Sequence, residues 1–277
     1  MPVHCSIDIE PLSTEAFREL DYKVMRHAFE SQNDLGRLAD ERIYQNDLAE
    51  RLRGDGIPVM QEIEVILSYE EYRKSLYLDL VVANQGIYEL KVAKAISDAH
   101  VGQLLTYLLL LDLPRGKLLN FGSSKVESRF VNAPFRTAQR RSFRVVDNEY
   151  QGPEHFKNLV VGLLRDWGTA LTISLYQDAL IVHLGGYDQV DVMMSMQRDK
   201  VSLGNQRFYL VTPESAFKIT SLNRKVEAFE QQLARLIHYS PLNAIHWVNV
   251  GQEEVMLKTV LRGVERVGFG TKMEVRK

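Results

Sequence analysis

Apolar and polar residues alternate along some segments and follow a helical spacing along others. Residues 58–67 read PVMQEIEVIL, in which Val59, Ile63, Val65 and Leu67 recur with the period of a half-buried strand. Residues 14–31, 34–56 and about 98–112 carry apolar positions three and four apart, which predicts helices, the last one starting at the N-cap residue Ser97. Further strands are predicted near 75–83, 86–92, 117–121 and 126–132. The pattern therefore predicts an α/β domain in the first half.

The second half is predicted to have the same order of elements. A helical region at about 154–184 precedes strands near 189–196, 206–212 and 215–221, a helix at 225–239, and strands near 244–250 and 254–261. Residues 34–52 align with 166–184, sharing the Tyr-Gln pair at 44–45 and 176–177. Beyond them a constant offset of 129 residues places Asn120 on Asn249. We therefore expect an internal duplication of one structural unit.

Composition places the chain among globular proteins. Its 277 residues are 45% hydrophobic and 25% charged, with a net charge of −2, so it is not a polycation. No apolar run reaches the roughly 18 residues of a membrane span, and no secretory signal is expected at the N-terminus. The single cysteine, Cys5, excludes an internal disulfide and a cysteine-rich metal site. We expect a cytoplasmic protein without membrane contact.

One segment is locally basic. Between Ser128 and Val146 there is no acidic residue, and we expect residues 134–152 to form a basic linker. The segment is either a solvated connection or a surface that contacts phosphates. Its arginines are Arg129, Arg136, Arg140, Arg141 and Arg144.

Three charges interrupt two predicted strands, in the stretch LDLVVANQGIYELK at 78–91. Glu89 and Lys91 are two residues apart and so share one face of a strand. If strand 75–83 pairs with 86–92 through the turn at 84–86, Asp79 reaches the same side. Such a group is either an ion pair on a solvated face or a site with a chemical role.

Two flanking helices carry further polar residues on single faces. Glu41 and Tyr44 lie three apart on one helix, and Gln103 and Tyr107 lie four apart on another. Carboxylate oxygens are the ligands that Mg²⁺ and Mn²⁺ prefer, and a neighbouring lysine can orient water or offset charge on a phosphate. The types and positions of these residues are therefore compatible with a magnesium or manganese site.

These residues also carry a resemblance. Asp79, then Glu89-Leu90-Lys91, followed by Gln103-x3-Tyr107, resembles the PD-(D/E)xK nuclease superfamily in its RecB-like branch with a Q-x3-Y helix. Residues 24–132 more closely resemble the GxxExxY proteins, in the segments LGRLADERIYQNDLAERLRGDGI, YLDLVVANQGIYELKVAKAISDAHVGQLLTYL and GKLLNFGSSKVESRFV. One departure is that the glycine that opens the naming motif falls on Leu38, whereas Glu41 and Tyr44 are kept.

The resemblance implies a restriction-endonuclease-like mixed sheet flanked by helices, and a role for each residue. Asp79, Glu89 and the Leu90 carbonyl would bind a divalent metal, with Glu41 as an additional ligand and Lys91 positioning the attacking water. Gln103 and Tyr107 would contact the nucleic-acid backbone or steady the site. His100 could face the same groove, and Glu62 or Glu64, expected to face solvent, could replace Glu41.

The second half lacks the carboxylates of this site at the equivalent positions. The offsets place Ile173, Phe208, Lys218 and Thr220 at the positions of Glu41, Asp79, Glu89 and Lys91. We therefore expect residues 1–33 as a helical lead-in, 34–133 as a nuclease-like domain, 134–152 as a linker, and 153–277 as a degenerate copy.

Three functions follow as hypotheses. The first is a Mg²⁺- or Mn²⁺-dependent nuclease acting on nucleic acid, with DNA expected before RNA, at a single first-half site. The second is a nucleic-acid-binding or assembly protein of a defence or repair system that does not cleave. The third is a helper that is active only with a partner protein. A homodimer is also compatible with the sequence. No phosphate-binding loop, metalloprotease pair or nucleophile elbow is present to favour another enzyme class.

Overall fold

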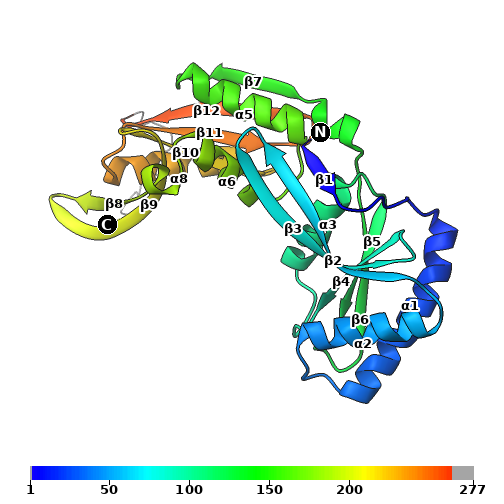
Figure 1. Ribbon diagram of the computed structural model, residues 1–277. Coiled ribbons are helices and arrows are strands. Elements are labelled where there is room, and N and C mark those ends of the chain that lie inside the picture. Colours follow the sequence, from blue (N-terminus) through cyan, green and yellow to red (C-terminus); the bar gives the residue numbers. More distant parts are fainter. Residues whose placement is uncertain (1, 264–277) are drawn as a thin grey trace, which may run out of the picture. The chain divides into compact units, whose positions relative to one another are not determined.

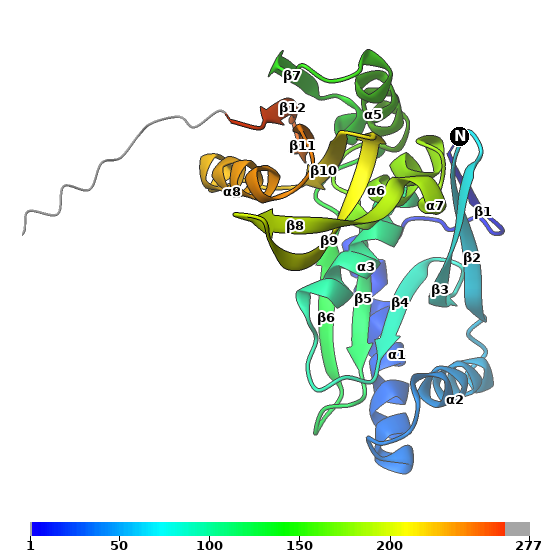
Figure 2. The same cartoon turned by 90° about the vertical axis from the view of Figure 1, so that its left-hand side faces the viewer.

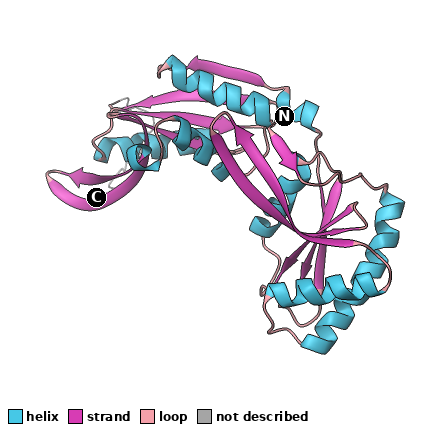
Figure 3. Ribbon diagram, in the orientation of Figure 1, coloured by secondary structure: helices cyan, strands magenta, loops and turns pink. Residues whose placement is uncertain are grey.

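The computed structural model describes residues 2–263, which form two compact units, each built on a six-stranded mixed sheet (Figures 1 and 3). Of the described residues, unit 1 comprises 2–144 and 159–183, and unit 2 comprises 145–158 and 184–263. Mixed sheets flanked by helices confirm the expected α/β class. Residues 264–277 of the expected second copy lie outside the described residues.

The sheet of unit 1 has the strand order β1-β2-β3-β4-β5-β6. Strands β4 and β5 are parallel, and the other neighbours are antiparallel. The parallel pair is joined through helix α3, as a parallel connection requires. The strands are β1 (Val3–Cys5), β2 (Val59–Tyr69), β3 (Tyr72–Val82), β4 (Gly86–Lys91), β5 (Arg115–Asn120) and β6 (Glu127–Asn132).

Helices cover both faces of this sheet. Helices α1 (Thr14–Leu35) and α2 (Glu41–Gly54) lie side by side on one face, where Phe17, Tyr44 and Leu48 pack against Leu80 and Leu90. Helix α3 (Asp98–Leu110) packs on the other face. Its apolar residues Leu104 and Leu108 contact Val81, Ile87 and Leu118. Burial of two layers of apolar side chains is the main stabilising contribution to this unit.

The segment between the two sheets is structured. Residues 134–152 contain helix α4 (Thr137–Arg141) and strand β7 (Arg144–Glu149). The helical region predicted at 154–184 is two helices, α5 (Glu154–Trp167) and α6 (Ile173–His183), separated where Gly168 has a φ of 80°. A positive φ ends a helix readily at glycine, which has no Cβ to clash.

Five strands of unit 2 repeat the order of β2–β6, whereas its sixth strand, β7, lies at the edge opposite to that of β1. The sheet of unit 2 has the order β7-β12-β11-β10-β9-β8, and helix α8 (Val226–Tyr239) packs on it (Figure 2). The parallel pair is again the one joined by a helix, β10 to β11. The remaining elements are α7 (Tyr187–Val190), β8 (Asp191–Arg198), β9 (Val201–Thr212), β10 (Ser215–Thr220), β11 (Ala244–Val250) and β12 (Glu254–Leu261).

The register of the strands matches between the two sheets. Leu80 pairs with Tyr88, and Tyr209, 129 residues further along the chain than Leu80, pairs with Phe217. The parallel pair and the hairpin that follows it keep the same offset. Asn120 accepts a hydrogen bond from the Ala93 amide, and its counterpart Asn249 accepts one from Leu222. The two sheets therefore share the order of five strands, the register of the last four of them and a buried side-chain contact.

The helices before the sheets share a contact too. The Tyr44 hydroxyl donates to the Gly36 carbonyl at 2.5 Å, and the Tyr176 hydroxyl donates to the Gly168 carbonyl at 2.6 Å. Both tyrosines are fully buried, and both glycines have a positive φ. The alignment of 34–52 with 166–184 thus corresponds to the same local structure in both places.

Candidate active site

The β3–β4 hairpin brings together the three charges that interrupt its apolar pattern. Lys91 Nζ lies 2.9 Å from Glu89 Oε1 and 3.8 Å from Asp79 Oδ2. The register that pairs Val82 with Gly86 and Leu80 with Tyr88 places Asp79 opposite Glu89. Convergence of these side chains was predicted from strand geometry, and it is observed.

The carboxylate of Asp79 is fixed by the neighbouring strand. Its Oδ2 accepts a hydrogen bond of 2.7 Å from the backbone amide of Leu90. The Asp79 side chain is 16% exposed, so one oxygen is held by the backbone while the group remains accessible. The Leu90 side chain itself is buried in the core on the α1–α2 face.

Helix α3 supplies the next contact. Gln103 Nε2 donates to Glu89 Oε1 at 2.5 Å, and the Tyr107 hydroxyl donates to the Tyr77 carbonyl at 2.7 Å. Gln103 therefore orients Glu89, and Tyr107 anchors α3 to β3. Both residues of the Q-x3-Y pattern hold the hairpin and its carboxylates in place.

Helix α2 contributes Glu41 from its first turn. Glu41 Oε1 is 3.5 Å from Lys91 Nζ, and its side chain is 42% exposed. Carboxylates from three elements therefore surround one ammonium group. Glu41 is the member of this group most open to solvent.

Burial raises the pKa of both strand carboxyls. The pKa of Glu89, whose side chain is 0% exposed, rises to about 8 because of burial first and the charge of Asp79 second. The pKa of Asp79 rises to about 6, again mainly through burial, against the favourable effects of Lys91 and the Leu90 amide. Burial alone would lower the pKa of Lys91, but Glu89 and Asp79 raise it, so Lys91 stays protonated.

The donor set fits a hard divalent cation. Glu89 Oε2 is buried and has no hydrogen-bond partner. An orphaned carboxylate oxygen beside a second carboxylate is costly, and a bound cation would relieve both the missing partner and the like-charge repulsion. Asp79, Glu89 and Glu41 supply the oxygen ligands that Mg²⁺ and Mn²⁺ take.

Gln45 and Glu62 lie beside Asp79, and the sequence analysis gave neither of them a main role in the site. Gln45 Nε2 donates to Glu62 Oε1 at 2.8 Å and to the Asp79 carbonyl at 2.7 Å. Glu62 has a φ of 52° in the middle of β2, a conformation that is strained for a residue with a side chain. The Tyr-Gln pair that the two halves share was the available signal for Gln45. No sequence pattern points to the backbone of Glu62.

Several other candidate residues lie elsewhere in unit 1. Tyr44 is buried and stacks on Phe121 with ring centroids 4.5 Å apart. His100 closes the capping box of α3, since its Nδ1 accepts from the Ser97 amide. These contacts give both side chains a role in holding helices.

The basic segment divides into exposed and buried arginines. Arg129, Arg136 and Arg144 are exposed, whereas Arg141 is half-buried. Arg140 is 1% exposed and donates to the carbonyls of Leu109, Trp167 and Thr169. Arg140 therefore connects helix ends inside unit 1, and its burial argues against a phosphate contact at this residue.

The corresponding positions of unit 2 hold no carboxylate. Phe208, at the position of Asp79, is buried in an apolar cluster, and Lys218, at the position of Glu89, is exposed. The Thr220 hydroxyl, at the position of Lys91, accepts from Trp247 Nε1 and donates to Asn249. Hydrogen bonds within the sheet thus replace the charges.

The acidic cluster around Lys91 lies within a segment that is similar to a known family. Residues 18–131 match the family model described as the PD-(D/E)XK nuclease superfamily, which supports a domain of this superfamily in the first half of the chain. Members of the superfamily are nucleases that generally use divalent metal ions. A comparison with curated proteins finds no match. Among the described residues, no helix combines the length and hydropathy needed to cross a membrane.

Proposed function

We propose that the chain is a metal-dependent nuclease that hydrolyses phosphodiester bonds at the group formed by Asp79, Glu89, Lys91 and Glu41. The observation that carries the proposal is the convergence of three carboxylates on Lys91, with one oxygen of Glu89 left buried and without a partner. Most buried carboxylate oxygens have a hydrogen-bond partner, so the orphaned Glu89 Oε2 supports a ligand at this place. The superfamily match over residues 18–131 supports the same reaction class.

Each residue has a role that its contacts support. Asp79, Glu89 and Glu41 would hold the cation, together with the Leu90 carbonyl, and we expect Mg²⁺ or Mn²⁺ there. The cation would supply Lewis acidity for water and charge neutralisation for phosphate. Lys91, kept protonated by its neighbours, would orient the attacking water and stabilise negative charge on the phosphate oxygens.

Gln103 is a positioning residue in this scheme. Its amide holds Glu89 Oε1, which leaves Oε2 free to face a ligand. Gln45 would act similarly through the carbonyl of Asp79. The contact of Gln103 also favours the finer assignment to the RecB-like branch and the GxxExxY type, which we include in the proposal.

We further propose that the second half is a duplicated, inactive copy. Equal strand register, the paired Asn120 and Asn249 contacts, and the paired tyrosine contacts support the duplication. Phe208 and Lys218 supply no ligand for a divalent cation. The copy would then contribute structure or substrate contact and no second cleavage site.

A cleavage assay tests the proposal. Plasmid, linear and single-stranded DNA, and RNA, are incubated with the protein and either Mg²⁺ or Mn²⁺, with a chelator as the negative control. We expect DNA cleavage that Lys91→Ala abolishes, while Lys94→Ala, a matched change at an exposed lysine three residues further on, leaves it unchanged. Cleavage that survives Lys91→Ala would show that the site is elsewhere. Salt-dependent DNA binding without cleavage under any metal would favour the non-cleaving alternative.

A further inference from the structure

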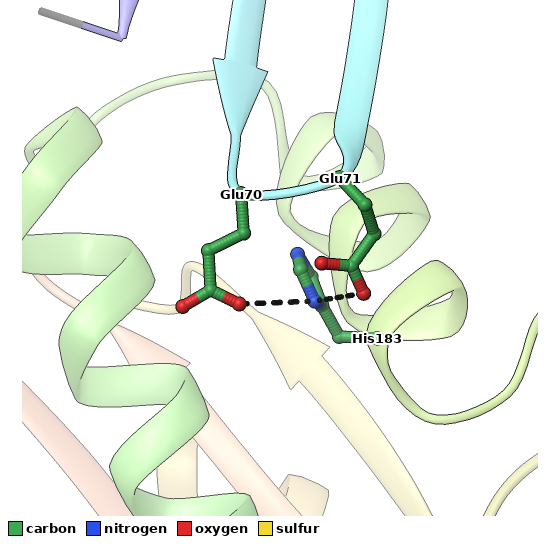
Figure 4. A group of neighbouring side chains, drawn as sticks. All are labelled: Glu70, Glu71 and His183. Atoms are coloured by element: carbon green, nitrogen blue, oxygen red, sulfur yellow. Dashed lines mark ion pairs between the residues drawn. The ribbon is translucent and has the colours of Figure 1, made fainter.

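A second group of potential metal ligands lies in unit 1, formed by Glu70, Glu71 and His183 (Figure 4). The two glutamates form the turn between β2 and β3, and His183 is the last residue of α6. One ligand atom from each residue lies within 4.8 Å of the other two. Residues more than a hundred positions apart in the sequence therefore point at one spot.

The orientation of the imidazole is set by its buried side. His183 is 4% exposed, and its Nε2 lies 3.1 Å from the Tyr69 carbonyl. A carbonyl only accepts, so Nε2 carries a ring proton, and the neutral imidazole in this tautomer would present the Nδ1 lone pair to the two carboxylates. The Tyr69 ring packs edge-on against His183, with centroids 5.2 Å apart, and this contact fixes the plane of the imidazole. A hydrogen bond from the far nitrogen to a carbonyl is the usual way in which a ligating histidine is oriented.

The spacing of the ligand atoms suits a small cation. His183 Nδ1 lies 3.0 Å from Glu71 Oε1 and 3.6 Å from Glu70 Oε2. Two ligands at about 2.1 Å from a tetrahedral zinc ion are about 3.4 Å apart, between these two distances. Lone pairs on nitrogen and oxygen repel at such distances unless a proton or a cation lies between them.

A divalent cation would balance the charges of this group. Within the part of the chain that the structure describes, no lysine or arginine forms an ion pair with Glu70 or Glu71. Turn chemistry does not explain the two glutamates either, because two-residue hairpin turns favour asparagine and glycine, and Glu70 has a φ of 48°.

In the first half of the chain, the residue aligned with His183 forms an ion pair. The alignment of 34–52 with 166–184 puts His183 at the position of Arg51, which pairs with Asp34 and Asp47. A permanently charged arginine is suited to an ion pair with aspartates. The imidazole of His183, unlike a guanidinium, can act as a metal ligand instead.

We propose that Glu70, Glu71 and His183 form a second metal site, specific for Zn²⁺ or a similar imidazole-binding transition-metal dication. Magnesium is not expected to bind there, since it prefers oxygen ligands alone. The bound ion fixes the β2–β3 turn to the C-terminal end of α6. Three protein ligands and exposed carboxylates, 65% and 64% for Glu70 and Glu71, leave room for a water ligand.

Zinc titration of the full chain tests the proposal. Isothermal titration calorimetry with zinc chloride is performed in a Glu89→Gln background, which removes the other carboxylate centre as a competitor. We expect one zinc equivalent in this background, lost in His183→Gln and in Glu71→Gln. The matched control Glu50→Gln, an exposed glutamate on α2, retains it.

Two further measurements separate the possible outcomes. Circular dichroism without zinc shows whether each variant folds, and thermal unfolding shows whether zinc raises the melting temperature of the background and not that of Glu71→Gln. Equal zinc binding by the background, His183→Gln and Glu71→Gln would overturn the proposal and leave an ion pair with protonated His183. Magnesium-dependent cleavage by Glu71→Gln in an otherwise unchanged chain reports separately on the proposed nuclease site.

Discussion

Glu89 is the acidic group whose ionisation should most affect the stability of unit 1. Burial, followed by the charge of Asp79, raises its pKa from 4.5 to about 8. In the unfolded chain the pKa returns to its ordinary value. Between about pH 4.5 and 8 the folded state therefore holds a proton that the unfolded state releases. The free energy of unfolding of the cation-free protein should fall as the pH rises through this window.

The size of the effect follows from the same shift. A rise from 4.5 to about 8, which already includes the opposing effect of Lys91, corresponds to at most about 5 kcal/mol, and we expect on the order of 2–3 kcal/mol because the buried site relaxes when Glu89 ionises. In Glu89→Gln the buried group stays neutral at every pH. Because 1 kcal/mol shifts the melting temperature of a domain of this size by about 2–4 °C, the variant should melt about 5–10 °C above the wild type at pH 8.5. The difference should vanish near pH 4.5.

Differential scanning calorimetry between pH 4.5 and 8.5, with a chelator present, measures this difference. Glu50→Gln makes the same chemical change at an exposed glutamate and should follow the wild type at every pH. Adding Mg²⁺ or Mn²⁺ at about a hundred times its dissociation constant should stabilise the wild type by about 2.7 kcal/mol and leave Glu89→Gln unchanged. If Glu89→Gln melts below the wild type at pH 8.5 without cations, Glu89 is a stabilising partner of Lys91 and the reasoning is refuted.

Three further outcomes are expected. Gln103→Ala should weaken Mn²⁺ binding by about 10–100-fold in calorimetric titration, because the amide orients Glu89; unchanged affinity would remove its positioning role. Tyr44→Phe should destabilise unit 1 by about 1–2 kcal/mol, since it leaves the Gly36 carbonyl without its donor, and Tyr176→Phe should destabilise it more in thermal unfolding, because the Leu171 amide also loses its acceptor; a smaller loss in Tyr176→Phe would contradict this. Arg140→Lys should lower the melting temperature of unit 1 nearly as much as Arg140→Ala, because an ammonium cannot reach three carbonyls as the guanidinium does, and full rescue by lysine would contradict this.

The sequence predicted most of the strands and the meeting of Asp79, Glu89 and Lys91. These predictions rest on short-range rules: side chains alternate along a strand, and a tight turn fixes the register of the hairpin that follows. Ser97 was predicted as a helix start on the same grounds, and it accepts a hydrogen bond from the His100 amide. Elements with a clear period or a capping residue are therefore visible in a single sequence.

Contacts between distant segments were not visible in the same way. Strand β1 and helices α4 and α7 were not predicted, because each is too short to show a period, and β7 was not predicted because it falls in the segment expected to be a basic linker. Arg140 reads as one of five basic residues, and only the fold shows that carbonyls from α3 and from residues 167–169 surround it. The strained backbone of Glu62 and the contact of His183 with the β2–β3 turn likewise depend on tertiary packing.

The three carbonyl contacts of Arg140 bear on how this chain can be divided. The superfamily match ends at residue 131, yet the compact unit that contains it also includes residues 159–183. A fragment cut at residue 133 would lose the donor to the Leu109 carbonyl and the helix that carries Lys74's partner, Asp178. The segment that matches the family model is thus shorter than the compact unit that contains it. A polypeptide designed on the family match alone would lack α6 and the contacts that α6 makes inside unit 1.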